Sequence, residues 1–318
     1  MLRRARRQAA GSLRRLKRYR GRGPKIESGG GGIRPENLVW IFGAARTGST
    51  WLGAMMADLD GHDWWHEPLV GHLFGHLYQE RAGQRHDDEH FILGGHGDLW
   101  LNPVRTFVLD SAARRFPAVA EGGRYLVIKE PHGSQGAPLL MQALPESRMI
   151  LLVRDPRDVV ASRLDLAREG SVSRQAMHRR DQAKKNLAAD ERPEDFVRGQ
   201  AKRYLRHIEF VKLAYDAHGG PKARIRYEDL MADTLGEMKR LYSALMIPVD
   251  ERELARVVQR HRWENIPERK KGKGKFHRKA TPGGWAEDLT PQQITTVEKI
   301  TAPLLEEFYP EDRPRTPK

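Results

Sequence analysis

Residues 38–59, LVWIF-GAARTGST-WLGAMMADL, join a short apolar run to an apolar segment compatible with a helix. The connecting loop carries Gly43 and Gly48, which have the spacing of a phosphate-binding loop, G-x-x-x-x-G. Glycines let successive backbone N–H groups point inward, and the N-terminus of the following helix adds partial positive charge. The stretch therefore predicts a strand, a phosphate-binding loop and a helix, in that order.

The loop differs from that of nucleotide triphosphatases at one position. Those proteins carry Lys and then Ser or Thr directly after the second glycine, whereas Ser49 stands in the lysine position here. The cation lies inside the loop instead, at Arg46. Such a loop suits one phosphate with a transferable group beside it better than a chain of three phosphates. The alternative of a glycine-rich turn that binds nothing is disfavoured by the preceding strand, the arginine and the hydroxyl pair.

A second charged segment follows another apolar run. Residues 149–153 read as a buried strand, and RDPRDVVAS follows at residues 154–162. In open α/β sheets, ligands bind outside the carboxyl ends of the strands. Pro156 suits the first turn of a helix. Arg154 is then expected at the strand end and Ser162 about two turns along the helix, with both in reach of one phosphate.

Four short apolar runs predict strands at residues 38–42, 125–128, 149–153 and 224–227, with helical patterns between them. This alternation predicts an α/β fold in which helices flank a central, mostly parallel sheet with a P-loop-type phosphate site. Capping boxes predict helix starts at Thr234 and at Thr290.

Composition narrows the class of protein. A chain of 318 residues with 39% hydrophobic residues can form one large folded domain. The absence of cysteine excludes disulfides, thiolate metal sites and cysteine nucleophiles. The formal net charge is +14, but residues 1–25 contribute eleven positive charges and residues 268–279 a net six, which leaves −3 for the rest. Specific nucleic-acid binding by the folded part is therefore not expected.

Residues 1–32 are predicted to form a basic arm with a glycine linker, ahead of a single domain at 33–318. The arm lacks the apolar region of a signal peptide, and no run of about 18 apolar residues predicts a membrane span. We expect a cytoplasmic protein. We interpret residues 1–25 as a solvated tail, with weak contact to an anionic surface, peripheral to a membrane, as the alternative hypothesis.

Taken together, the segments resemble the sulfotransferases that use 3′-phosphoadenosine 5′-phosphosulfate (PAPS). GAARTGSTWL resembles their 5′-phosphosulfate loop, and LLVRDPRDVVAS resembles their 3′-phosphate strand and helix. RYEDL at residues 226–230 resembles a segment whose tyrosine contacts the nucleotide. FHRKATPGGW at residues 276–285 resembles the late loop that closes over the 3′-phosphate. The four motifs occur in family order between residues 38 and 290.

The resemblance implies a role for each matching residue. Arg46 would lie at the transferring sulfuryl group, and Trp51 and Tyr227 would contact the adenosine. The implied 5′-phosphate contacts are Thr47, Gly48, Ser49 and Thr50. The implied 3′-phosphate contacts are Arg154, Ser162, Arg278 and Lys279. The chain departs from the pattern at Ala280, where cytosolic relatives commonly have glycine.

The same resemblance implies in-line transfer of a sulfuryl group from PAPS to a hydroxyl of a carbohydrate, lipid or small metabolite. A base must remove the acceptor's proton, and the candidates are Glu67 first, His132 second and Glu130 third. No metal is expected, because the histidine pairs at residues 62 and 66 and at residues 72 and 76 lack a third ligand.

Two other functions stay open at this point. One is a P-loop kinase or nucleotide hydrolase, which the missing lysine disfavours. The other is a basic surface-binding module on the same fold, which the net charge of −3 outside the two basic segments disfavours. The sequence names neither the acceptor nor an oligomeric state.

Overall fold

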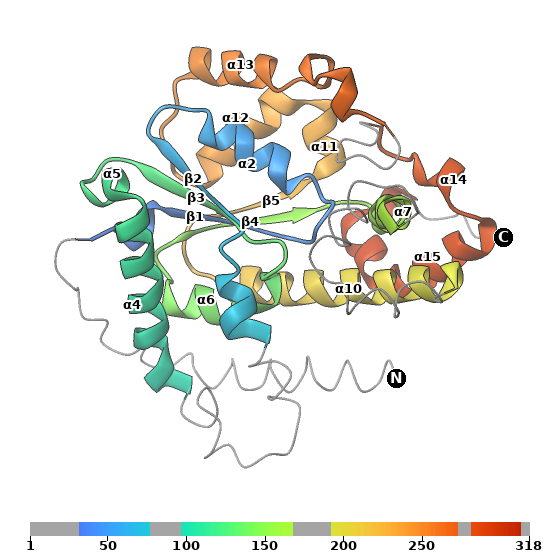
Figure 1. Ribbon diagram of the computed structural model, residues 1–318, viewed down its shortest axis with the longest axis horizontal. Coiled ribbons are helices and arrows are strands. Elements are labelled where there is room, and N and C mark those ends of the chain that lie inside the picture. Colours follow the sequence, from blue (N-terminus) through green and yellow to red (C-terminus); the bar gives the residue numbers. More distant parts are fainter. Residues whose placement is uncertain (1–31, 77–96, 168–191, 273–280, 313–318) are drawn as a thin grey trace.

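A computed structural model describes residues 32–76, 97–167, 192–272 and 281–312. Within these ranges, five parallel strands form the centre of the protein in the order β2-β3-β1-β4-β5 (Figure 1). Their bounds are β1 (Leu38–Phe42), β2 (His62–His66), β3 (Tyr125–Lys129), β4 (Arg148–Val153) and β5 (Lys222–Arg226). The predicted α/β fold with a parallel central sheet is confirmed.

Helices cover both faces of the sheet (Figure 1). One face packs against α2 (Ser49–Ala57), α11 (Tyr227–Ala232), α12 (Thr234–Ala244) and α13 (Glu251–Arg260). The other packs against α4 (Gly97–Arg115), α6 (Ala137–Ala143), α10 (Pro193–Ala217) and α15 (Pro291–Phe308). Past the end of β4 lies α7 (Pro156–Ala167). The shorter elements are η1 (Pro35–Asn37), the π-helical η2 (His72–His76), α5 (Pro117–Ala120), η3 (Ser134–Gly136), η5 (Trp263–Asn265), η6 (Glu268–Lys270), α14 (Trp285–Asp288) and η7 (Pro310–Asp312).

The central strand β1 shows why the sheet has two hydrophobic cores. Its side chains alternate between the faces, as strand geometry requires. Val39 and Ile41 enter the core beneath α2 and α12, whereas Trp40 and Phe42 enter the core beneath α6 and α10. All five residues of β1 are fully buried, as expected for an inner strand of a parallel sheet.

The sequence missed one strand and misplaced another. No strand was predicted at β2, because HDWWH is polar at both ends and lies at the sheet edge, where partial exposure removes the apolar run. Strand β5 covers residues 222–226 instead of 224–227, since Tyr227 already begins α11. In this second edge strand, basic residues alternate with Ala223 and Ile225, which shortens the apolar run that the prediction relied on.

The two predicted capping boxes had different outcomes. At Thr290, the hydroxyl accepts from the Gln293 N–H, and the Gln293 side chain accepts from the Thr290 N–H, so this prediction is confirmed. The box at Thr234 is wrong. The cap lies one residue earlier, where the Asp233 carboxylate accepts from the Gly236 N–H at 2.9 Å. Aspartate and threonine are both good caps, so adjacent candidates are difficult to separate by sequence.

The strand order places a topological switch point between β1 and β4. After β1, the chain forms β2 and β3 on one side of that strand, and β4 and β5 then form on the other side. Ligands in open α/β sheets bind at such a switch point. The two strand ends meet closely here, because a Cβ at Gly43 would lie 2.5 Å from the Leu152 carbonyl oxygen.

None of the helices in the described ranges has the length and apolar character needed to cross a membrane. The predicted basic arm at residues 1–32 lies almost wholly outside the described residues, and its boundary with the domain stays a prediction. On the domain side of that boundary, Ile33 is buried in the core.

Replacing Gly43 with alanine is expected to destabilise the fold by about 1–3 kcal/mol, because the new methyl group would overlap backbone that cannot rotate away. Gly199→Ala is the matched control. Gly199 lies within α10 with nothing within 4 Å of its would-be Cβ. That variant should be neutral or more stable by up to about 1 kcal/mol. Urea unfolding followed by circular dichroism measures both, and equal midpoints would contradict the close packing of β1 on β4.

Candidate active site

The loop after β1 is shaped to present backbone N–H groups. Arg46 has φ 78° and Gly48 has φ 90°, which are left-handed conformations that reverse the chain before α2 begins at Ser49. The Thr47 hydroxyl is buried and donates to the Ala44 carbonyl at 2.7 Å, so this side chain stabilises the loop from within. The N–H groups of Gly48, Ser49 and Thr50 have no acceptor among the described residues. N–H groups without an acceptor at a helix N-terminus are the donors that an anion site uses.

Two aromatic side chains border this loop. Tyr227 packs so closely on Gly48 that a Cβ there would lie 2.5 Å from the ring. Trp51 meets the Tyr227 ring edge-on, with centroids 6.2 Å apart, and its Nε1 donates to the His261 carbonyl at 2.9 Å. A flat heterocycle attached to the bound anion would find aromatic walls here.

Arg154 approaches the loop from the end of β4. Its Nη1 donates to the Arg46 carbonyl at 3.2 Å, and its guanidinium stacks on Tyr227 at 4.2 Å from the ring centroid. The Tyr204 hydroxyl holds the backbone of Arg154 in place, because it accepts from the Arg154 N–H and donates to the Arg154 carbonyl. The Arg154 Nε is buried without a partner in the described structure. The guanidinium is thus positioned in advance and retains an unused donor.

Ser162 brings α7 into the same cluster. Its hydroxyl accepts from the Arg46 Nε at 3.0 Å. The structure therefore places Arg46, Arg154 and Ser162 together, although they come from two segments more than a hundred residues apart. This cluster joins the two motifs that the sequence singled out.

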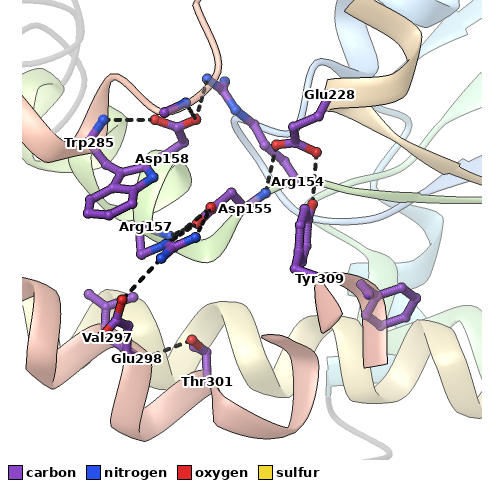
Figure 2. A network of polar contacts seen from close by, with 12 residues as sticks. Arg154, Asp155, Arg157, Asp158, Glu228, Trp285, Val297, Glu298, Thr301 and Tyr309 are labelled. Carbon is purple, nitrogen blue, oxygen red and sulfur yellow. Dashed lines mark hydrogen bonds and ion pairs between the residues drawn. The ribbon is translucent and has the colours of Figure 1, made fainter. Parts of the chain in front are cut away.

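A polar network ties the chain beyond residue 280 to the start of α7 (Figure 2). Asp158 accepts from the N–H groups of Gly283 and Trp285, both at 3.0 Å, and lies 3.7 Å from the Arg154 Nη2. Arg157 stacks on the Trp285 ring at 4.1 Å. Its guanidinium also pairs with Asp155 and Glu298.

The network shows where the loop predicted at residues 276–285 rejoins the described structure. Its anchor at Gly283 and Trp285 shares Asp158 with Arg154, so the chain rejoins the protein beside the predicted 3′-phosphate residue. Arg278 and Lys279 lie outside the described residues, and their role stays a prediction.

A second cluster connects the loop to the ends of β2 and β3. The Lys129 Nζ lies 2.9 Å from the Thr50 hydroxyl and 2.6 Å from the Glu67 Oε1. The other carboxylate oxygen of Glu67 lies 3.2 Å from the His132 Nδ1. The hydrogen bond from His132, together with Lys129, lowers the pKa of Glu67 to about 2. Burial lowers the pKa of Lys129.

This cluster bears on the choice among the candidate bases. A carboxylate with a pKa of about 2 is a weak proton acceptor near neutral pH. His132 is held at Nδ1 by that carboxylate, has a largely exposed side chain and keeps Nε2 for an acceptor proton. A carboxylate that orients an imidazole is the arrangement of a base with its orienting partner.

Glu130, the third candidate, is fully buried and turned away from the solvent. Its Oε2 accepts from the Leu69 N–H at 3.1 Å, and burial raises its pKa to about 8. The bond holds the turn after β2, where Glu67 and Leu69 both have positive φ, 49° and 61°. Glu130 therefore supports the turn that presents Glu67.

Lys129 was not among the predicted site residues. A signal for it was present, since Lys129 directly follows the strand predicted at residues 125–128, and ligands bind at the carboxyl ends of strands in such sheets. In the described part of the chain, no three His, Asp or Glu side chains gather as a metal site would need.

Comparisons with known proteins agree with this geometry. A family model described as "Sulfotransferase family" matches residues 39–251. Among solved structures, mouse sulfotransferase SULT7A1 complexed with PAP is 14% identical with a TM-score of 0.52, over 86% of this chain and 85% of that one. Sulfotransferase STF9 from Mycobacterium avium is 16% identical with a TM-score of 0.52, over 95% and 83%. At these identities the structures establish the shared fold. No curated protein sequence matches.

Glu130→Gln is expected to remove a pH dependence of stability. The folded protein keeps the Glu130 proton up to about pH 8, whereas the unfolded chain loses it near pH 4.3. The free energy of unfolding of the wild type should therefore fall between these values, by about 1.4 kcal/mol per pH unit. As the pH rises to 8, the free energy of unfolding of Glu130→Gln should increase relative to that of the wild type. The exposed control Glu121→Gln should show no such relative increase. Urea unfolding at pH 5, 6.5 and 8 checks this, and parallel curves would contradict a protonated Glu130.

Proposed function

This chain belongs to the sulfotransferase family, and from that premise we propose that it transfers a sulfuryl group from PAPS to an acceptor hydroxyl at the carboxyl ends of β1, β3 and β4. The observation that carries the proposal is that Arg46, Arg154 and Ser162 lie together. These side chains are suited to bind two phosphate groups of one nucleotide. Ser49 stands where a protein that binds a nucleoside triphosphate would have lysine.

The N–H groups without a partner in this site suit adenosine 3′,5′-bisphosphate. The N–H groups of Gly48, Ser49 and Thr50 suit the 5′-phosphate, because they point from a helix N-terminus and have no acceptor within the described residues. The unpartnered Arg154 Nε suits the 3′-phosphate, with Ser162 beside it. Trp51 and Tyr227 suit the adenine. Arg278 and Lys279 complete the proposed set.

The chemistry follows from the second cluster. The acceptor oxygen attacks the sulfur, the bond between sulfur and the phosphate oxygen breaks, and that oxygen leaves with the electron pair. Arg46 and Lys129 are placed to stabilise charge on the leaving phosphate. The acceptor proton goes to the His132 Nε2, while Glu67 orients the imidazole and stabilises its charged form.

The products are the sulfated acceptor and adenosine 3′,5′-bisphosphate. The acceptor is a hydroxyl compound, for which we propose a carbohydrate, lipid or small metabolite. A cytoplasmic location, and weak contact of residues 1–25 with anionic surfaces, remain predictions from the sequence.

Calorimetric titration with adenosine 3′,5′-bisphosphate, without Mg²⁺, tests the donor site. We expect binding that requires the 3′-phosphate, so that 5′-AMP binds at least about tenfold more weakly, which is about 1.4 kcal/mol. Arg154→Ala should lose that preference. The control is Arg256→Ala, an exposed cation on α13 with no ion pair among the described residues. A preference for Mg²⁺-ATP would favour a kinase or nucleotide hydrolase, and salt-sensitive binding of anionic polymers alone would favour a surface-binding module.

Variants of the second cluster test the assignment of the base. His132→Ala should lower turnover by about 10²–10⁴-fold, the usual contribution of a general base. Glu67→Gln should lower it less, because the imidazole remains. Both should bind adenosine 3′,5′-bisphosphate within about twofold of the wild type. Turnover is measured with labelled PAPS and the best acceptor from a panel of sugars, phenols and alcohols. Full turnover by His132→Ala with loss in Glu67→Gln would make Glu67 the base, as the sequence predicted.

A further inference from the structure

A second guanidinium contacts the loop one residue before the carbonyl that Arg154 contacts. Arg163, on α7, donates from Nη1 to the Gln200 side-chain oxygen at 2.6 Å and from Nη2 to the Ala45 carbonyl at 3.4 Å. Its Nε is buried without a partner. No carboxylate among the described residues pairs with this guanidinium. A largely buried positive charge with neutral partners alone is costly for a protein to hold.

The facing helix adds to the positive charge. Gln200, Arg203 and His207 recur at i, i+3 and i+7 on α10, so they share one helix face. Arg203 is exposed and has no ion pair in the described structure. His207 is 5% exposed, and its Nδ1 has no partner. Burial and the charges of Arg203 and Arg163 lower the pKa of His207 to about 3, so the imidazole is neutral.

This face lies between the loop and the proposed base. Arg163 follows Ser162 and is turned from it by about 100° around α7, so that its guanidinium reaches Gln200 on α10. It reaches the loop at Ala45, ahead of the N–H groups proposed for the 5′-phosphate. At the other end of the face, His132 is among the charges that act on His207. The face formed by these three side chains thus extends from the loop toward the proposed base.

We propose that Arg163, Arg203 and His207 form a subsite for an anionic group of the acceptor, a carboxylate, phosphate or sulfate. The inference rests on the proposed function and deepens it, since it names an acceptor that is already negatively charged. An anion here would supply the negatively charged partner that Arg163 lacks and would accept charge-assisted hydrogen bonds from the cationic side chains of this face.

Thermal unfolding of the protein saturated with adenosine 3′,5′-bisphosphate tests the subsite. With the donor phosphates already in place, the probes are glucuronate, glucose 6-phosphate and neutral glucose, with ionic strength held constant by sodium chloride. We expect the two anionic sugars to raise the Tm and glucose to leave it unchanged. Arg163→Gln should weaken the apparent affinity for the anionic sugars at least about tenfold.

Two further variants control the experiment. Arg203→Gln changes an exposed side chain and so should fold normally; it should also lose part of the anion-dependent shift. Arg198→Gln, which changes an exposed cation on the opposite side of the same helix, should retain all of it.

The outcomes separate the two proposals. If adenosine 3′,5′-bisphosphate itself fails to raise the Tm, the proposed function is overturned, and the subsite with it. If it does raise the Tm, the subsite alone is overturned by an equal response to glucose and the anionic sugars, or by an anion-dependent shift that survives in both Arg163→Gln and Arg203→Gln.

Discussion

The close contact between the loop after β1 and the end of β4 is the constraint on which the site depends. Glycine at position 43 lets the two strand ends approach so closely that a Cβ would overlap the Leu152 carbonyl. That approach brings Arg154 within hydrogen-bonding distance of the Arg46 carbonyl, and it brings Ser162 within hydrogen-bonding distance of the Arg46 guanidinium. Because both strands lie inside the sheet, the donors proposed for two phosphates belong to one rigid unit. Electrostatic stabilisation then requires little rearrangement when charge develops.

The acids near the site are used to hold the cations in place. Glu67 lies between Lys129 and His132, and Asp158 joins Arg154 to the chain beyond residue 280. Each carboxylate orients its partners, but neither removes the local excess of positive charge. Arg163 has no acid at all among the described residues. The chain outside the two basic segments has a net charge of −3. It nevertheless gathers positive side chains at the carboxyl ends of its strands, where anionic substrates would be attracted.

Candidates for the donor half of the site could be named from the sequence because those residues are consecutive. Strand β1 with its loop, and β4 with the start of α7, are each a single segment with a recognisable pattern. The acceptor half depends on contacts between segments. Glu67 meets Lys129 and His132 because β2 pairs with β3, and no strand was predicted at β2. Arg163 and His207 come from separate helices without any motif. Periodicity cannot reveal that their faces meet.

The edge strand also explains how the base is held. Glu67 and Leu69 adopt left-handed conformations that cost about 1–3 kcal/mol each, and the turn persists because the β3 end braces it. Glu130 accepts from the Leu69 N–H, and a Cβ at Gly71 would overlap the Gly133 carbonyl. The turns after β2 and β3 are therefore interlocked. The proposed donor site depends on the geometry of inner strands, whereas the proposed base and anion subsite depend on an edge strand and surface helices. The two parts meet at the loop, where Lys129 contacts Thr50 and Arg163 contacts the Ala45 carbonyl. The donor could be inferred from the sequence because its motifs are continuous, and the acceptor had to be approached through charge.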